Sequence, residues 1–260
     1  MTDPHLLLDA YDAQLRTDAE TPSAVAVTRL GPLRLVTFAG GRGFVTYPRP
    51  GDGDDLAALV APALEHYRAD PAITRVEWKT RGHDRTPGLP EALRDAGFSP
   101  DATESIMIGD ARSLDVDVPL PAGVALRRVT EEADVRAMSA MADEAFGDPA
   151  STRMADALLR RLALDDGMEL WVAEAGGEVI STGRLEPVAG TTVAGLWGGA
   201  TRADWRGRGI YRALTAARAR SALARGLTLV HSDSTEGSRP ILERSGLVRV
   251  STTTPYRWRR

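Results

Sequence analysis

The sequence of 260 residues contains no cysteine. This absence excludes disulfide bonds, thiolate zinc sites, iron–sulfur clusters and any covalent mechanism that uses an enzyme thiol. Histidine is also scarce. The four histidines (His5, His66, His83 and His231) stand far apart and show no H-E-x-x-H or comparable ligand spacing. We therefore expect no metal site.

Long hydrophobic runs are missing as well. No apolar stretch approaches the roughly 18 residues that a membrane-spanning helix needs. The N-terminal stretch "MTDPHLLLDAYDAQ" has no positive charge before its apolar part, which argues against a secretory signal peptide and favours a cytoplasmic location. The net charge of −4 argues against a general nucleic-acid binder, so any basic site must be local. We expect no nucleic-acid or membrane partner, and a monomer or homodimer.

The chain contains an internal repeat. Residues 72–99 ("AITRVEWKT" then "PEALRDAGFS") resemble residues 226–248 ("GLTLVHSDS" then "PILERSGLV"). An alanine-rich helical stretch precedes each copy, at 55–71 and 211–226. Because order, type and spacing agree together, we predict a duplicated structural unit.

The segment "DARSLDVDVPLPAG" is rich in Pro, Asp and Gly and reads as a linker. It divides the chain into an N-terminal domain (1–110), a linker (111–123) and a C-terminal domain (124–260). Periodicity in the C-terminal half predicts strands and helices. The strands are 124–129, 168–175, 178–188, 192–201, 227–233 and 247–258, and the helices are 130–147, 153–167, 210–224 and 238–245. We predict an α+β fold with a mostly antiparallel mixed sheet flanked by helices.

The stretch "DWRGRGIYRAL" (204–214) joins a predicted strand to a predicted helix. Gly207 and Gly209 precede the helix, where backbone amides have no intrahelical partner and where glycine permits close approach of a ligand. Free amides and the positive end of the helix dipole together favour an anion. Four arginines could add charge-assisted hydrogen bonds to phosphate: Arg202, Arg206, Arg208 and Arg212. The pattern predicts a phosphate cradle, and the alternative is a solvated basic loop.

Two other interpretations of this region fit less well. A Rossmann fingerprint would need Gly or Ala at position 212, which is arginine. His231, Asp233 and the nearby serines invite a hydrolase interpretation, but the sequence has no G-x-S-x-G elbow.

The run from Arg206 to Tyr211 resembles the acyl-CoA signature of the GNAT (GCN5-related) N-acetyltransferase superfamily, Q/R-x-x-G-x-G/A. The resemblance covers about residues 120–260, including the later L-x-x-x-G-L segment. The whole chain resembles a tandem GNAT protein whose N-terminal half has degenerated. That half lacks the motif, and its long helix is preceded by Asp52, Asp54 and Asp55, which would repel an anion.

The resemblance implies an N-acetyltransferase that uses acetyl-CoA as cosubstrate. The amine of a small molecule or peptide would attack the thioester directly within a ternary complex. The residues implied to bind the cofactor are Gly199, Ala200, Thr201, Arg206, Gly207, Arg208, Gly209, Ile210, Tyr211, Ser234 and Ser238. The acceptor itself is left open.

Two positions depart from the family pattern. Tyr211 stands where the family has Gly or Ala, so close approach of the cofactor there is in question. Leu242 stands where many members carry a tyrosine that protonates the departing thiolate. The missing tyrosine keeps a second function open, that of a CoA or acyl-CoA sensor without catalysis.

Two residues are candidates for proton transfer. Glu186 lies on the strand next to the motif strand and is the candidate base, although pairing with Arg184 would explain it equally well. Tyr256 on the final strand is the candidate acid if it points to the thiol, and otherwise it is a packing residue.

Overall fold

The computed structural model describes residues 3–260. Its α-helices are α1 (Pro4–Leu15), α2 (Val60–Arg68), α3 (Leu89–Asp95), α4 (Glu132–Phe146), α5 (Arg153–Leu162), α6 (Ile210–Ala224) and α7 (Arg239–Arg244). The strands of the first half are β1 (Ala26–Leu30), β2 (Leu33–Phe38), β3 (Arg42–Thr46), β4 (Arg75–Arg81), β5 (Ser99–Pro100) and β6 (Glu104–Asp110). Those of the second half are β7 (Val124–Val129), β8 (Glu169–Ala175), β9 (Glu178–Pro187), β10 (Val193–Thr201), β11 (Leu229–Ser234) and β12 (Val248–Arg259).

One mostly antiparallel sheet runs through both halves of the chain, in the order β1-β2-β3-β4-β12-β6-β11-β10-β9-β8-β7. The halves exchange strands at its centre. The C-terminal strand β12 lies between β4 and β6, which belong to the first half, and β6 lies between β12 and β11. Neither half therefore completes its part of the sheet with its own residues alone.

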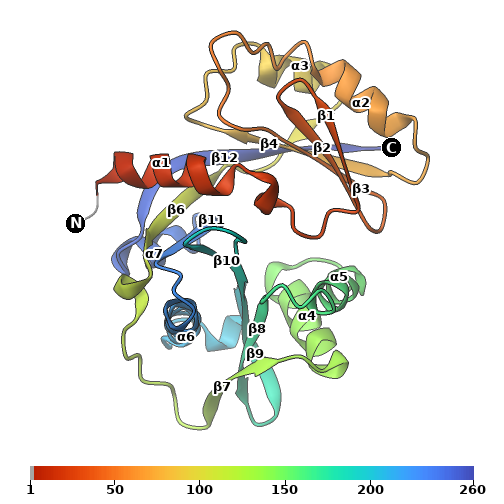
Figure 1. The fold of residues 1–260 in the computed structure, drawn as a ribbon. Helices are drawn as coiled ribbons and strands as arrows, with labels where there is room; N and C mark the ends of the chain where they lie inside the picture. The colour runs from red at the N-terminus through yellow and green to blue at the C-terminus, as the bar shows by residue number, and fades with distance from the viewer. Residues whose placement is uncertain (1–2) are drawn as a thin grey trace.

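Helices cover both faces of this sheet (Figure 1). We call β1–β4, β12, α2 and α3 the N-terminal lobe, and β6–β11 with α4–α7 the C-terminal lobe. Helix α1 crosses the junction and packs on β12 and β6. Helices α4 and α5 lie on one side of the C-terminal strands and α6 on the other. The junction under α1 positions the site described below.

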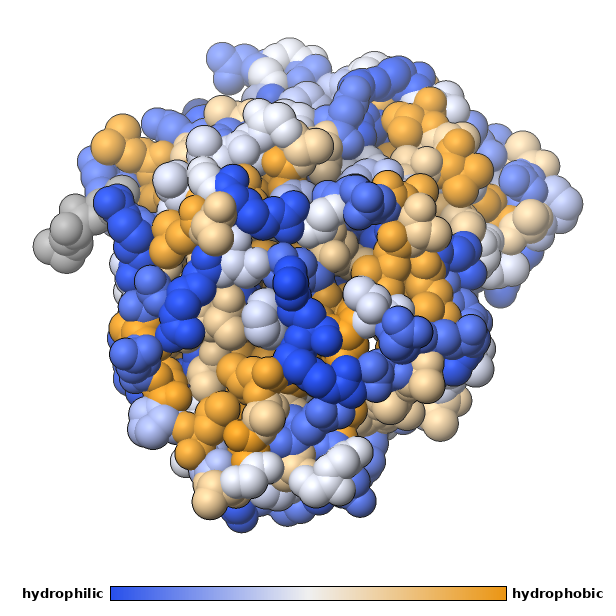
Figure 2. Space-filling model, turned by 60° about the horizontal axis from the view of Figure 1, so that its bottom comes forward, coloured by the Kyte–Doolittle hydropathy of each residue, from blue (hydrophilic) through white to orange (hydrophobic). Residues whose placement is uncertain are grey.

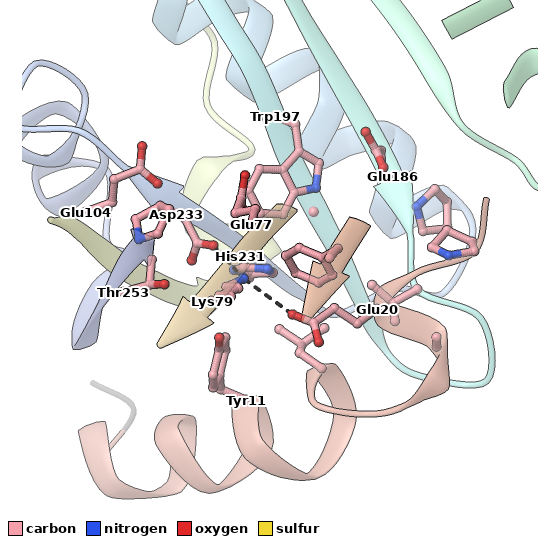
Figure 3. Close-up of a pocket in the computed structure, with 18 of the residues that line it drawn as sticks. Tyr11, Glu20, Glu77, Lys79, Glu104, Glu186, Trp197, His231, Asp233 and Thr253 are labelled. Atoms are coloured by element: carbon pink, nitrogen blue, oxygen red, sulfur yellow. Dashed lines mark ion pairs between the residues drawn. The ribbon is translucent and has the colours of Figure 1, made fainter. Parts of the chain in front are cut away.

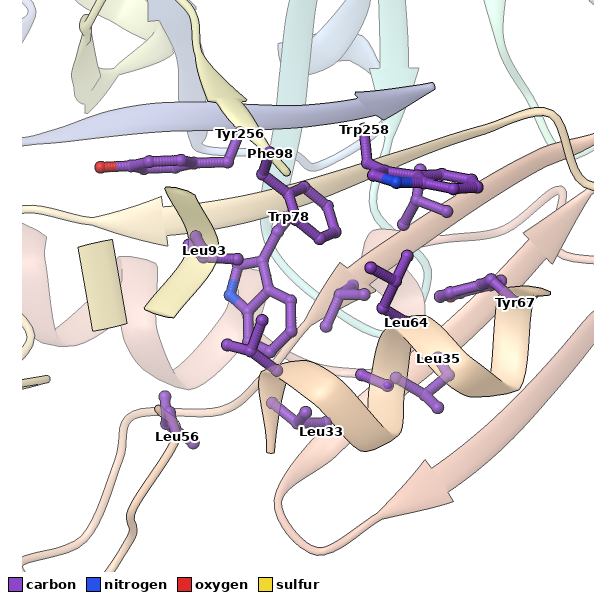
Figure 4. Packing of buried hydrophobic residues seen from close by; sticks show 14 of the residues in the cluster. Leu33, Leu35, Leu56, Leu64, Tyr67, Trp78, Leu93, Phe98, Tyr256 and Trp258 are labelled. Atoms are coloured by element: carbon purple, nitrogen blue, oxygen red, sulfur yellow. The ribbon is translucent and has the colours of Figure 1, made fainter. Parts of the chain in front are cut away.

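The N-terminal lobe has an aromatic core. Along β4, Val76 and Trp78 are buried on one face because successive side chains of a strand point to opposite sides. Trp78 meets Phe98 edge to face at 6.4 Å, and Figure 4 shows it among the leucines of α2, α3 and β2. Tyr256 and Trp258 of β12 complete this cluster.

The C-terminal lobe packs α6 against β10 and its neighbours. Ala219, Ala222 and Leu242 form one cluster with strand residues of this lobe, and Ile210 and Leu214 form another. The alanines of α6 allow the helix to approach the sheet closely, since they add little volume between helix and strand. The linker also contributes, because Leu114 is buried in the first of these clusters.

The expected fold class is confirmed, and most elements of the second half lie where the periodicity placed them. Helix α1 and strand β6 were not anticipated. The segment "ESIMIGD" of β6 ends where the linker composition begins. The domain boundaries at 110 and 124 stay a prediction. They divide the chain in sequence, but in space strands from each side of this division pair with strands from the other side.

The surface mixes polar and apolar side chains. On the face that Figure 2 turns forward, hydrophobic residues form several patches separated by hydrophilic ones. No helix among residues 3–260 is both long and apolar enough to cross a membrane.

Candidate active site

The loop before α6 forms a cradle of free backbone amides. Gly207 and Gly209 adopt the left-handed φ values of +75° and +80°, and Gly209 caps the helix without a side-chain hydrogen bond. Within the described residues, no backbone N–H from 207 to 212 donates a hydrogen bond. A Cβ added at Gly207 would meet nothing within 4 Å, so the cradle is open. Such a loop is suited to a phosphate.

The arginines around this cradle have different roles. Arg206 donates from Nε to the Thr201 carbonyl (3.0 Å) and from Nη2 to the Ala145 carbonyl (3.0 Å), which ties the loop to β10 and α4. Arg202 forms ion pairs with acidic neighbours instead of facing the cradle. Arg208 stacks over Trp205 at 4.8 Å. Along the described chain, Arg208 and Arg212 have no carboxylate within ion-pair distance, so they are the cations left for a ligand.

Tyr211 fits against the motif strand because Gly199 lacks a side chain. A Cβ at Gly199 would lie 2.7 Å from Cε2 of Tyr211. The half-buried tyrosine thus replaces the small residue of the family pattern, and a glycine on β10 accommodates it. The large side chain of Tyr211 and the missing side chain of Gly199 thus compensate for each other in volume across the helix–strand contact.

Strands β10 and β11 separate from each other close to the contact between Tyr211 and Gly199. Their parallel pairing extends only from Val193 and Leu229 to Gly195 and His231. Beyond it, β10 bulges against β9 between Trp197 and Ala200. The end of β10 therefore leaves β11 and leads toward the cradle at the start of α6.

A buried arginine holds the bulge in place. Arg218 of α6 is 1% exposed, and its guanidinium donates to the carbonyls of Arg184 (3.1 Å) and Trp197 (3.5 Å). Burial lowers the pKa of Arg218 to about 10. Gly183 provides the space, because a Cβ there would lie 2.6 Å from the guanidinium carbon. The guanidinium also donates to the Leu214 carbonyl and the Thr215 hydroxyl, both at 3.1 Å. Its bonds to Arg184 and Trp197 fix the position where the two strands separate.

A cavity of about 280 Å³ lies between the lobes at this parting. Glu186, Gly195 and His231 pair across β9, β10 and β11, so they share the sheet face that forms one wall. Helix α1 contributes Tyr11 from the opposite side (Figure 3). A side chain at Gly195 would collide with the indole of Trp197, which meets the His231 ring edge to face at 5.0 Å.

Buried charges from both lobes meet in this cavity. Nζ of Lys79 lies 2.8 Å from Oδ2 of Asp233 and 3.5 Å from Oε1 of Glu20. Glu20 is held further by Arg81 at 2.7 Å. Burial raises the pKa of Asp233, but the positive charge of Lys79 and its hydrogen bond to the carboxylate outweigh this effect and leave the pKa below its usual value. The lysine thus links the N-terminal lobe to β11 through an ion pair.

Two buried polar atoms of residues that line the cavity have no hydrogen-bond partner among the described residues: Nδ1 of His231 and Oδ1 of Asp233. Burial lowers the pKa of His231 to about 4, so its imidazole is neutral near pH 7. Buried polar atoms are normally hydrogen-bonded. His231 and Asp233 therefore bring unused hydrogen-bonding capacity to the wall of the cavity.

The sequence-based candidates are divided between two places. Glu186 lines the cavity, where Arg161 (2.8 Å) and Arg184 (3.0 Å) hold its carboxylate. Tyr256 is not brought to the site. It lies in the aromatic cluster of the N-terminal lobe, because its neighbour Pro255 takes the cavity-facing position on β12. Burial and strand alternation explain this placement.

The remaining candidates lie at the end of β10, at the start of α6, at the end of β11 and at the start of α7. Gly199, Ala200 and Thr201 form the end of β10, and Ile210 is buried at the start of α6. Ser234 is 1% exposed and its Oγ has no partner within residues 3–260. Ser238 caps α7 and donates to the Thr235 carbonyl at 3.3 Å.

Sequence reasoning did not identify which residues of the first half line the cavity. Tyr11 and Glu20 come from segments that carry no motif, and Lys79 lies in the first copy of the repeat without a signal of its own. His231 and Asp233 did carry a signal, their alternation on one strand face, but it suggested a hydrolase.

Comparison with known proteins defines the class of protein. Residues 119–232 match the model of the acetyltransferase (GNAT) domain. A GCN5-related N-acetyltransferase from Kribbella flavida is 20% identical over 98% of this chain and 95% of its own, with a TM-score of 0.66. A tandem GNAT protein from the clavulanic acid biosynthesis pathway is 15% identical over 98% and 95%, with a TM-score of 0.63. Comparison with curated protein sequences gives no match.

Residues 119–232 therefore belong to the GNAT acetyltransferase family, and the chain as a whole has the fold seen in tandem GNAT proteins. A further similar structure, a GCN5-related N-acetyltransferase from Sphaerobacter thermophilus, is 22% identical over 87% of this chain and 76% of its own, with a TM-score of 0.60. The family generally transfers an acetyl group from acetyl-CoA to an amine.

Proposed function

We propose that this protein is an acetyl-CoA-dependent N-acetyltransferase whose acceptor amine enters the cavity between the lobes. The observation that carries the proposal is the arrangement around the end of β10. An open cradle of free amides lies at one end of this segment, and a cavity lined by Glu186, His231 and Asp233 lies at the other. An elongated thioester can reach both.

The cradle suits the pyrophosphate of acetyl-CoA. Free amides from Gly207 to Arg212 would donate to phosphate oxygens, and Arg208 would add positive charge. The unpartnered hydroxyl of Ser234 lies on the same side of the sheet as α6 and offers a further donor. The end of β10, at Gly199, Ala200 and Thr201, would carry the pantetheine toward the cavity.

The chemistry requires that an amine lose a proton and attack the acetyl carbon. A C–N bond forms, the C–S bond breaks, and CoA leaves as a thiolate that takes up a proton. An amine with a pKa near 10 is mostly protonated at neutral pH, so a base must receive its proton. We assign this role to Glu186, directly or through a water, with His231 and Asp233 as acceptors that orient the amine.

One observation favours the alternative, a sensor that binds CoA without transfer. Leu242 is 1% exposed in the core of the C-terminal lobe, and Tyr256 is buried in the other lobe. Neither position supplies a proton to the leaving thiolate, which would have to be protonated by solvent.

The test is calorimetric titration of acetyl-CoA into the wild type, Gly209→Asp and Gly209→Asn. Both side chains tolerate the left-handed conformation at this position and are similar in shape, but only aspartate adds a negative charge. We expect micromolar binding by the wild type, at least about 100-fold weaker binding by Gly209→Asp, and binding by Gly209→Asn within a few fold of wild type. Absence of binding by the wild type would overturn the proposal.

Release of free thiol from acetyl-CoA across a panel of amines then separates transfer from sensing. Glu186→Gln should lower kcat by about 10²–10⁴-fold while acetyl-CoA affinity stays unchanged. Tight binding without turnover on any amine would favour the sensor. Turnover that Glu186→Gln leaves intact would remove Glu186 as the base.

A further inference from the structure

Three arginines lie side by side on neighbouring strands of the N-terminal lobe. Arg42 of β3 pairs with Arg75 of β4, and Arg75 pairs with Arg259 of β12. Residues paired across adjacent strands point to the same face of the sheet, with Cβ atoms about 5 Å apart. This arginine row therefore places three positive charges on one sheet face, where like charges opposite each other cost stability.

In the described part of the chain, no carboxylate forms an ion pair with the row, although Glu77 lies close enough to act on the charge of Arg42. Among residues 3–260, none lies within 4.0 Å of a guanidinium nitrogen of Arg42, Arg75 or Arg259. Glu77 lies two residues beyond Arg75 but is nearest to Arg257, at 3.9 Å, and Arg257 is itself paired with Asp101 at 2.7 Å. The row thus carries an excess of positive charge that a bound anion would neutralise.

The row lines a hollow. The hollow has a volume of about 250 Å³. Its lining residues come from β3, β4 and β12, and the charged ones are Arg42, Arg75, Glu77, Arg257 and Arg259. Arg42 is half-buried, and its guanidinium lies over the ring of Phe38 at 4.1 Å. Stacking and burial restrict this side chain, so it loses less freedom when an anion binds.

The hollow adjoins the cavity between the lobes. Glu77 lines both spaces, and Phe44, which pairs with Glu77, lines the cavity. Along β4 the alternation of Arg75, Glu77 and Lys79 leads from the arginine row to the lysine of the cavity. Four residues of strand span about 13 Å.

We propose, resting on the transferase function above, that the arginine row binds the anionic group of the acceptor while its amine enters the cavity. The acceptor is then an elongated amine with a phosphate or carboxylate group on the order of 10 Å from the reacting nitrogen. Guanidinium groups bind both kinds of anion in a bidentate manner.

The first measurement establishes whether the row binds an anion. The full chain is saturated with CoA, which fills the cradle, and inorganic phosphate is added while arginine Nε–Hε signals are followed by NMR. We expect the signals of Arg42, Arg75 and Arg259 to shift with a dissociation constant in the millimolar range or below. The double variant Arg42→Gln/Arg75→Gln should bind at least about tenfold more weakly.

A matched control is Arg94→Gln/Arg244→Gln. It removes the same charge from two exposed arginines on α3 and α7, neither of which is in an ion pair among the described residues. This variant should bind phosphate as the wild type does.

The second measurement tests whether the anion that the arginine row binds is part of the acceptor molecule. Calorimetry on the CoA-saturated protein compares amines that differ only in the far group, such as a dipeptide and its C-terminal amide, and an aminoalkyl phosphate and its alcohol. We expect the anionic member of at least one pair to bind about tenfold more tightly or better. That ratio should fall toward one in Arg42→Gln/Arg75→Gln and stay unchanged in the control.

Two results would overturn this assignment. In the first, phosphate leaves the three arginine signals unmoved, and the row is then a solvated surface. Alternatively, phosphate binds but neither matched pair is discriminated, and the row then serves a free anion. Both results rest on binding, whereas loss of thiol release from acetyl-CoA would count against the transferase function instead.

Discussion

At the scale of single residues, the buried imidazole of His231 couples stability to pH. It is 4% exposed and lies between the lobes, where burial lowers its pKa to about 4. The unfolded chain has the ordinary value near 6.5. Between these two values the unfolded state binds the proton and the folded state does not. Stability is therefore complete above about pH 6.5 and is lost as the pH falls toward 4.

We expect this one group to remove about 3 kcal/mol of stability between pH 6.5 and 4. His231→Gln keeps a neutral polar side chain that does not titrate, so its unfolding free energy should change less over this range. Urea denaturation of both proteins at several pH values measures the difference. Equal slopes for the two proteins would show that His231 does not carry the effect.

At the scale of elements, the contact between α6 and β10 depends on the pair Gly199 and Tyr211. Gly199→Ala places a methyl group 2.7 Å from the tyrosine ring, so we expect it to cost about 1–3 kcal/mol. In a Tyr211→Ala background the same change should cost nearly nothing, because the ring is gone. Urea denaturation of the four proteins gives the coupling energy.

Gly53→Ala is the matched control for this cycle. Gly53 has open space around it and no positive φ, so the added methyl group should leave stability nearly unchanged. If Gly199→Ala costs as much without the tyrosine ring as with it, the two residues do not compensate for each other.

At the scale of the whole molecule, the exchanged strands make the halves interdependent. A fragment of residues 1–117 lacks β12, which leaves β4 and β6 without their shared neighbour, and a fragment of residues 118–260 lacks β6. Exposed strand edges promote aggregation. We expect each fragment to aggregate or stay unfolded when expressed alone, and the two to purify as one folded complex when expressed together.

Size-exclusion chromatography and circular dichroism distinguish these states. The linker between Asp115 and Pro119 is a suitable place for the break, because its residues are mostly exposed. A fragment that folds alone as a monomer would show that the exchanged strand is dispensable for that half.

Much of the C-terminal lobe could be predicted from sequence. The glycines before α6 and the alternation along β10 are local signals, since they depend on residues a few positions apart. The same holds for the cradle. Gly207 and Gly209 are required by left-handed backbone at those positions, and their spacing before an apolar helix face was sufficient to indicate an anion site.

The repeat also indicated that the two halves have similar elements, but not how they would pair. β6 and β12 are both the last strands of their halves, and β6 is apolar on both faces, since Ile106 and Met107 are buried in clusters on opposite sides of the sheet. A strand that is buried on both faces is compatible with either neighbour, so its sequence is consistent with exchange or with no exchange. The choice depends on contacts between residues more than 100 positions apart.

By itself, the sequence determined the α+β fold class, the glycine loop before α6 and the absence of an enzyme thiol, because these follow from residue type and short spacing. Only the tertiary structure decided what surrounds the cavity. It placed Tyr256 in a core, and it brought Glu20 and Lys79 to Asp233 and the arginine row next to the cavity. These contacts link segments far apart in the chain, and burying charges there is favourable only once both lobes are folded together.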